Sequence, residues 1–185
     1  MKSYKTYCIF IFFFLNTTLM QGQEIDIINI EKQIGNNNWS IVNDNVMGGI
    51  SESNLSINDK NNLIFNGSVS LENNGGFASS RLSIEKGSLK KIKGFKIKFI
   101  GDGKTYKLRL RQSNRRVSYS TDFDTIQGKW LEIEIPLEDL KPMWRGYYYD
   151  SPLLEIENIN SIGFQISDKQ EGFFELEIKF VKGVY

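Results

Sequence analysis

Apolar and polar residues alternate along most of the chain from residue 39 onward. In one stretch, for example, Tyr106, Leu108 and Leu110 alternate with basic residues. Successive side chains of a β-strand point to opposite faces, so this period of two predicts strands with one buried and one exposed face. The most regular examples lie at residues 95–99, 106–111, 131–135 and 174–180.

Shorter and less regular apolar stretches extend the same pattern. They predict further strands at residues 50–57, 63–71, 76–84, 117–123 and 161–167, separated by turn-forming residues at 58–62, 101–103 and 127–129. A short helix is expected near residues 24–32 or 137–140. Many short strands at this spacing indicate an all-β fold, namely an antiparallel β-sandwich of the jelly-roll kind.

The segment 137–157 interrupts the alternation and contains the aromatic run MWRGYYY at 143–149. A connection of this length is often functional. Sugars pack their C–H faces on Trp and Tyr rings, so Trp144, Arg145 and Tyr147–Tyr149 are the leading binding candidates on chemical grounds. Such residues are equally typical of protein interfaces, and in a third interpretation they cover an open end of the sandwich.

The first 23 residues have the layout of a signal peptide. Lys2 and Lys5 form a basic start, an apolar run covers 7–15, and the segment NTT at 16–18 and then MQGQ at 20–23 follow it, with cleavage expected near Gly22 or Gln23. The run is shorter than the roughly 20 apolar residues that a membrane span requires, and an uncleaved anchor is the alternative. We therefore expect export to the periplasm or the medium, and a single mature domain at 24–185.

The composition restricts the chemistry of the chain. There is no histidine, and the single cysteine, Cys8, lies in the expected leader. Ser-His-Asp triads, Cys-His pairs and His-rich zinc sites are therefore excluded, and no cofactor is expected. A structural Ca²⁺ held by oxygen atoms would suit the composition, but no ligand spacing demands one. Of the 23 basic residues 21 lie outside the leader, against 22 acidic ones, so nucleic acid is not an expected partner.

Two segments carry paired glycines, NDNVMGGIS at 43–51 and NNGGFASSR at 73–81. Their spacing differs from that of a dinucleotide-binding loop. Glycine permits a positive φ or a close approach of two backbones, which predicts capped turns that share one corner of the fold. In the alternative, Asp44 points outward and Ser51 lines a groove beside it. The structural positions are Gly48, Gly49, Gly75 and Gly76.

These segments belong to an ordered series of motifs, which is Trp39, the two glycine pairs, Phe65-Asn66-Gly67, Gly101-Asp102-Gly103, Trp130, Arg145-Gly146 and Ile162-Gly163-Phe164. The series resembles the Complex I intermediate-associated protein 30 family over about residues 36–182. The resemblance implies a galactose-binding-like β-sandwich, which is also seen in carbohydrate-binding modules. It further implies the role of the best-known members, which are mitochondrial assembly factors of respiratory complex I.

Arg81 is expected to be partly buried, because the alternation places it on the same strand face as Phe77. A buried arginine requires a carboxylate partner. The sequence therefore predicts that Arg81 pairs with Asp44 or Asp102 and ties the motif loops together.

Lys107, Arg109 and Arg111 share one face of their predicted strand. Such a face could hold an anionic polysaccharide or a phosphate. The favoured interpretation is a solvated face whose charges meet Glu132 and Glu134 on a neighbouring strand, each cross-strand pair contributing about 0.2–1 kcal/mol.

The sequence predicts a protein that binds rather than catalyses. The first hypothesis is an interaction protein of the assembly-factor or chaperone-like kind, with a protein partner. The alternative is a carbohydrate-binding module of the cell envelope, with a glycan partner. A glycan-active enzyme, with Asp122 and Asp124 as candidate carboxylates, is a weaker alternative. The binding candidates are Asp44, Ser51, Asn74, Arg81, Asp102, Tyr106, Trp144, Arg145 and Tyr147, and no metal site is expected.

Overall fold

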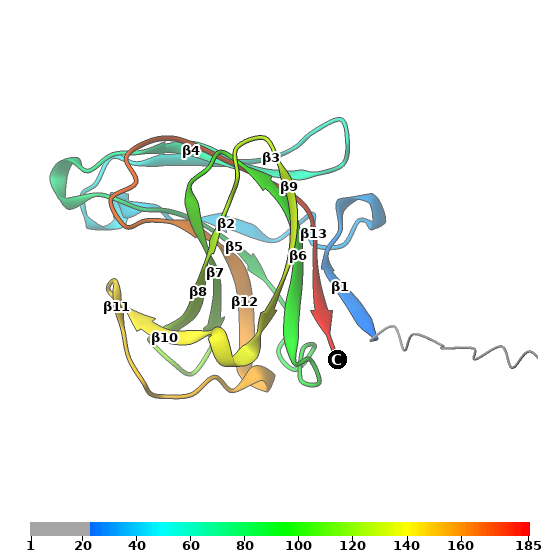
Figure 1. Cartoon of the computed structure of the whole chain (residues 1–185). Coiled ribbons are helices and arrows are strands. Elements are labelled where there is room, and N and C mark those ends of the chain that lie inside the picture. The colour runs from blue at the N-terminus through cyan, green and yellow to red at the C-terminus, as the bar shows by residue number, and fades with distance from the viewer. Residues whose placement is uncertain (1–22) are drawn as a thin grey trace, which may run out of the picture.

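The computed structural model describes residues 23–185, which form two antiparallel sheets packed face to face (Figure 1). The six-stranded sheet contains, in spatial order, β3 (Glu52–Ile57), β4 (Leu63–Val69), β13 (Gly172–Val184), β6 (Gly94–Gly101) and β9 (Trp130–Pro136), with β1 (Glu24–Ile28) also paired to β13. The seven-stranded sheet contains β11 (Tyr147–Tyr148), β10 (Lys141–Trp144), β8 (Ser118–Asp124), β7 (Thr105–Gln112), β12 (Ile159–Ile166), β5 (Ala78–Ser83) and β2 (Trp39–Ile41). The predicted antiparallel β-sandwich is confirmed.

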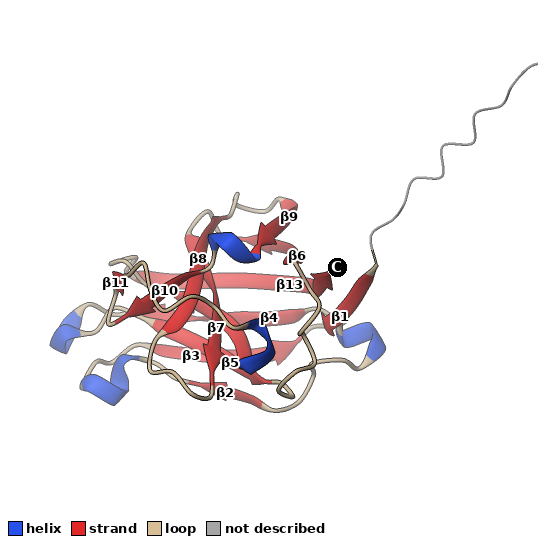
Figure 2. Ribbon diagram, turned by 90° about the horizontal axis from the view of Figure 1, so that it is seen from below, coloured by secondary structure: helices blue, strands red, loops and turns tan. Residues whose placement is uncertain are grey.

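Short 3₁₀ helices occupy several of the connections (Figure 2). They are η1 (Ile30–Lys32), η2 (Asp44–Met47), η3 (Glu72–Asn74), η4 (Leu137–Asp139) and η5 (Ile156–Asn158). Across residues 23–185, no helix has the length and apolar character needed to cross a membrane. The predicted signal peptide lies almost entirely outside the described residues.

The core lies between the two sheets and is rich in aromatic side chains. The rings of Phe65 and Phe174 lie 5.0 Å apart within the six-stranded sheet. Phe99 of that sheet meets Phe123 of the other at 4.9 Å, both in tilted geometry. Offset or tilted rings at such distances add about 0.5–1.5 kcal/mol to the energy of burial. The alternating apolar residues of both sheets therefore bury the faces that the sequence pattern predicts.

The strand predictions hold with small changes in their bounds, and two predictions about other segments need correction. The short helix expected near 24–32 or 137–140 is present at both places as one 3₁₀ turn, η1 at 30–32 and η4 at 137–139. Residues 24–28 instead form the strand β1, whose residue Glu24 lies opposite Val184 at the end of β13. The pairing partner lies at the far end of the chain, where a local pattern cannot reveal it. The irregular segment 137–157 contains the β10–β11 hairpin, which extends the seven-stranded sheet at one edge.

The expected partners of the basic strand are also wrong. Glu132 and Glu134 belong to β9, which pairs with β6 in the six-stranded sheet. They lie beside Lys98 and Lys96, with nitrogen–oxygen distances of 3.7 and 3.2 Å respectively. The basic residues of β7 lie in the other sheet, so these glutamates do not neutralise them.

Candidate functional site

Asp44 is the centre of the corner that the two glycine pairs build. Its side chain is completely buried and accepts hydrogen bonds from the backbone N–H groups of Ser51 (2.9 Å), Gly76 (2.6 Å) and Phe77 (3.2 Å). The Ser51 hydroxyl also donates to Asp44, and it accepts the N–H of Ser70 at 2.9 Å. Asp44 thus joins η2 to the start of β3 and to the approach to β5.

The two glycines of each pair have different roles, since one adopts a positive φ angle and the other packs closely against Asp44. Gly48 and Gly76 adopt positive φ angles of 94° and 129°, which side chains disfavour. Gly49 and Gly75 instead pack against the Asp44 carboxylate, where a Cβ on Gly49 would clash with it and one on Gly75 would lie 2.8 Å from it. The prediction of one shared structural corner is confirmed.

The predicted pairing of Arg81 with Asp44 or Asp102 is wrong. Burial by itself would raise the pKa of Asp44, but the hydrogen bonds of Ser51, Gly76 and Phe77 hold it below the ordinary value. Hydrogen-bond donors, and not an arginine, therefore stabilise the negative charge of Asp44. Asn74 is exposed in η3, near this corner.

Arg81 lies instead on the outer face of the seven-stranded sheet, which is the face turned away from the core. Its strand neighbour Leu82 points into the core, just as Leu108 and Leu110 of β7 do. Register places Arg109 of β7 beside Gly163 of β12, and Gly163 in turn lies beside β5 at Arg81. The complete row across the sheet is Lys141, Ser120, Arg109, Gly163, Arg81 and Ser40.

Arg81, Arg109 and Arg111 form what we call the arginine cluster. Burial, followed by the charges of Arg111 and Arg81, lowers the pKa of Arg109 to about 10. Burial and the charge of Arg111 likewise lower the pKa of Arg81, and burial lowers that of Arg111. None of the ion pairs within residues 23–185 includes these arginines.

Lys107, on the same face, has a contrasting environment. It is 3% exposed, and its ammonium group lies 2.5 Å from Asp122 and 2.8 Å from Asp168. Burial would lower its pKa, but the two carboxylates outweigh burial and raise it. Lys107 also donates to the Tyr148 hydroxyl at 3.4 Å. Within the described residues the charge of Lys107 is therefore neutralised by carboxylates, and the charges of the arginine cluster are not.

The β10–β11 hairpin forms the rim of this face. Arg145 and Gly146 turn the chain with positive φ angles of 50° and 83°. Trp144 and Tyr147 are opposite each other and exposed, and the Arg145 guanidinium lies 5.7 Å from the Trp144 ring. Tyr148 is opposite the outer-face residue Met143 and therefore points over the sheet. It lines a pocket of about 410 Å³ together with Ser120, Thr121, Asp122, Asp139 and Lys141.

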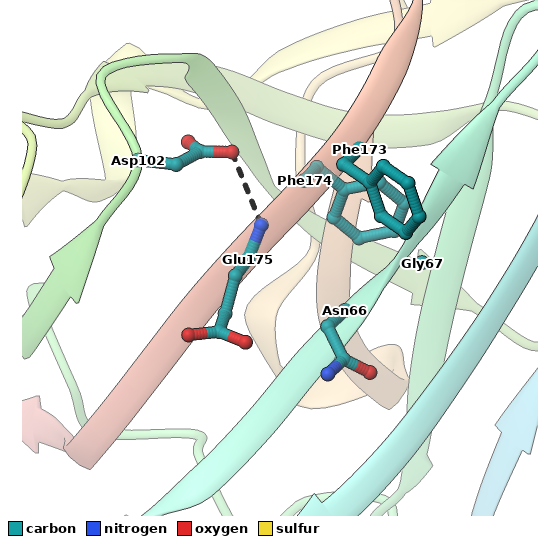
Figure 3. A pocket seen from close by; sticks show the side chains of 6 residues that line it. All are labelled: Asn66, Gly67, Asp102, Phe173, Phe174 and Glu175. Carbon is teal, nitrogen blue, oxygen red and sulfur yellow. Dashed lines mark hydrogen bonds between the residues drawn. The ribbon is translucent and has the colours of Figure 1, made fainter.

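Asp102 and Tyr106 lie away from this face, at the turn between β6 and β7. Tyr106 is buried in the core and donates its hydroxyl to Asp102 at 3.1 Å, and burial together with Asp102 raises its pKa. Asp102 also accepts the backbone N–H of Glu175, as Figure 3 shows. Asp102 lines a second pocket, of about 530 Å³, with Asn66, Gly67, Phe173, Phe174 and Glu175. The contacts of both residues fix the turn between β6 and β7.

The structure thus separates the predicted site residues into three places. Asp44, Ser51 and Asn74 belong to the glycine corner, Asp102 and Tyr106 to the β6–β7 turn, and Arg81, Trp144, Arg145 and Tyr147 to the seven-stranded sheet and its rim. The final list of binding candidates omitted Arg109, Arg111 and Tyr148. The sequence pattern had nevertheless offered Arg109 and Arg111 as an anion-holding face and had placed Tyr148 in the aromatic run. Residues 23–185 contain no group of three or more acidic side chains suited to a metal ion.

Comparisons with known proteins agree with this architecture. The sequence pattern of the family described as Complex I intermediate-associated protein 30 matches residues 28–178. The chain belongs to this family. A curated relative, the mitochondrial Complex I intermediate-associated protein 30 of Mus musculus, is 28% identical over 172 residues. The match covers 80% of this chain, and the chain spans about half, 52%, of that relative's length.

This member of the Complex I intermediate-associated protein 30 family shares its fold with carbohydrate-binding modules. The family 11 module of a cellulosomal cellulase of Clostridium thermocellum superposes with a TM-score of 0.66 at 16% identity, covering 88% of this chain and 95% of that one. A family 11 module from the same bacterium, in complex with a β-1,3-1,4-mixed-linked tetrasaccharide, superposes with a TM-score of 0.64 at 16% identity, covering 87% and 95%. At this identity the likeness shows the fold.

Proposed function

We propose that the chain is a non-catalytic binding protein that holds a glycan across the outer face of the seven-stranded sheet. The observation that carries this proposal is the row of small residues in which Ser120, Gly163 and Ser40 alternate with Lys141, Arg109 and Arg81. Small residues leave room along the sheet, and the long side chains between them offer donors to sugar hydroxyls.

An aromatic rim completes the chemistry that a sugar requires. Tyr148 presents a half-exposed ring next to the pocket over β8, where a sugar ring could pack its C–H face. The carbohydrate-binding modules of the same fold support this choice of ligand class, since one of them is seen with a bound tetrasaccharide.

The carboxylates of β8 support the non-catalytic part of this proposal. Asp122 is paired with Lys107 at 2.5 Å, and Asp124 accepts the hydroxyl of Thr105 at 2.6 Å. Glycoside hydrolysis requires one carboxylic acid and one carboxylate facing each other across a cleft. Both candidate residues lie on a single strand, and each is already engaged by a neighbour.

The test is a comparison of two adjacent tyrosines. Tyr148→Ala should weaken polysaccharide binding about fivefold to tenfold, because it removes the ring that points over the sheet. Tyr147→Ala, which removes the same group from the opposite side of the hairpin, should leave binding unchanged. Affinity gel electrophoresis with a panel of neutral and acidic polysaccharides measures both. Binding to none of the panel by the correctly folded protein would count against the proposal.

A protein partner is the second candidate, favoured by a separate surface. Val46 and Met47 expose 68% and 62% of their surface at η2, and Ile50 beside them exposes 52%. Exposed apolar side chains that gather in this way are typical of interaction sites. The relative in Mus musculus is named for its association with complex I intermediates, which is a role in protein assembly. Replacing Val46 and Met47 with serine should abolish capture of such a partner and preserve glycan binding.

We further propose that the protein works after export. The basic start and the short apolar run of residues 1–23 support this proposal. Intact-mass analysis of the protein from its own cells tests it. A mass that begins near residue 23 or 24 is expected, and full-length protein in the cytoplasm would argue against export.

A further inference from the structure

The arginine cluster places three positive charges close together on a partly buried part of the sheet. Arg109 and Arg81 occupy the same row of the sheet, two strands and thus about 10 Å apart, with Gly163 between them. Arg111 follows Arg109 on the same face of β7, about 7 Å further along the strand. The three positive charges therefore surround a patch of sheet that carries small side chains.

The cluster lacks the neutralising groups that buried charges require. Within residues 23–185 the Nε of Arg81 is buried and has no acceptor. Arg109 donates to neutral acceptors, the hydroxyl of Ser118 at 2.8 Å and the side-chain oxygen of Gln165. Burying a charge costs free energy unless it is paired, and like charges close together add to that cost. An anion bound among the guanidinium groups would remove both costs.

Only small side chains lie between the arginines of this row. Gly163 carries no side chain between Arg109 and Arg81, and Ser161 and Ser79 lie on the same face beside it. A Cβ at position 163 would overlap the carbonyl oxygen of Ser80 and lie 3.0 Å from the Cα of Arg81, so β12 and β5 approach closely here and bring Arg81 into the row of Arg109. Planar guanidinium groups bind carboxylate and sulfate oxygens through two parallel hydrogen bonds.

We propose that the arginine cluster is an anion-binding subsite that recognises the carboxylate or sulfate ester group of an acidic polysaccharide. This inference rests on the proposed function, because it names the class of glycan held by the same face. Lys107 on this face is excluded from the subsite, since Asp122 and Asp168 already neutralise it. An uncharged glycan would leave the cluster unpaired.

The experiment compares three polymers: polygalacturonate with carboxylates, a sulfated galactan, and a neutral β-1,3-1,4-glucan. Arg81→Gln and Arg111→Gln should each weaken binding to at least one acidic polymer about tenfold. Arg116→Gln is the matched control, because it removes an equal charge from an exposed turn. It should change affinity by less than about twofold. Titration at rising salt should weaken binding of the acidic polymers.

Stability without ligand gives an independent measurement. Neither Arg81→Gln nor Arg111→Gln removes a side-chain partner among the described residues, and each relieves repulsion between the arginines. The melting temperature of both variants should therefore equal or exceed that of the wild-type protein. A fall of more than about 5 °C would show a structural role and overturn the proposal.

The remaining outcomes separate the inference from the proposed function. Equal binding of neutral and acidic polymers, unaffected by the two variants, would overturn the subsite and leave glycan binding intact. If the folded protein bound no polymer, both proposals would fall. If inorganic sulfate alone stabilised the wild-type protein and the polymers did not bind, the cluster would be a small-anion site and the proposal would be overturned. The carboxylated and sulfated polymers distinguish the two anionic groups.

Discussion

Asp44 shows how a single buried residue can organise a sequence motif. The glycine pairs attract attention because they lie in polar, loop-like segments. In the structure they surround one buried carboxylate, which accepts three backbone N–H groups and one hydroxyl. A residue of this kind holds loops together, and its replacement affects stability first.

Asp44→Asn should destabilise the protein by about 3 kcal/mol, because the amide nitrogen cannot accept the bonds that the carboxylate accepts. For a chain of this size, that corresponds to a fall in melting temperature of roughly 6–12 °C. Thermal unfolding followed by circular dichroism measures it. Asp59→Asn, in an exposed turn, is the control and should be neutral. Equal melting temperatures for the two variants would contradict this role of Asp44.

The effect of Asp44 should also depend on pH. Its pKa in the folded protein lies below the ordinary value of 3.8. A depressed pKa contributes stability that is fully present above the unfolded value and is lost as pH falls through the folded value. The difference in melting temperature between wild type and Asp44→Asn should therefore be constant from pH 7 to about pH 5 and narrow below about pH 3.8. If the difference in melting temperature persisted unchanged to pH 2.5, protonation of Asp44 would not be linked to stability.

At the scale of elements, the contact between β12 and β5 decides where the arginines lie. Gly163 lets the two strands approach, and a side chain there would overlap the carbonyl oxygen of Ser80. The same approach brings Arg81 into the row of Arg109. The stability of this contact and the arrangement of the proposed anion subsite therefore depend on one glycine.

Gly163→Ala should cost about 3 kcal/mol, at the upper end of the range for overpacking, since backbone atoms must move. Gly128→Ala is the comparison, because its Cβ would meet no atom within 4 Å. It has a φ of 69°, and the change should cost about 1 kcal/mol through backbone strain alone. Chemical denaturation resolves the two values, and similar losses for both variants would show that the close approach carries no energetic weight.

At the level of the whole molecule, the charged residues of the two sheets differ in how they are paired. Lysines and glutamates of β6 and β9 pair on the six-stranded sheet, and the arginines that form no ion pair within residues 23–185 lie on the seven-stranded sheet. The outer faces of a sandwich point in opposite directions, so charges on one cannot screen contacts on the other at close range.

Replacing both Glu132 and Glu134 with glutamine tests this separation. The exposed ion pairs with Lys98 and Lys96 contribute about 0–1 kcal/mol each, so the melting temperature should fall by only a few degrees. Affinity for an acidic polysaccharide should be unchanged. A tighter or looser complex in the double variant would mean that β9 lies closer to the binding face than the two-sheet topology allows.

The sequence by itself determined the strands and the side of each strand that is buried. Tyr106, Leu108 and Leu110 alternate with basic residues, and the hydrophobic effect places the first set in the core whatever the strand's neighbours are. The turns of the two glycine pairs were also predictable, because a positive φ angle is a local requirement that favours glycine.

The tertiary structure alone decided which charges meet. Arg109, Glu132 and Arg81 are each on the exposed face of a strand, and the periodicity says nothing about which sheet that strand joins. Glu132 joined the opposite sheet, and Arg81 joined the sheet of Arg109. Strand pairing depends on contacts between residues far apart in sequence, so the arginine cluster exists only in the folded molecule.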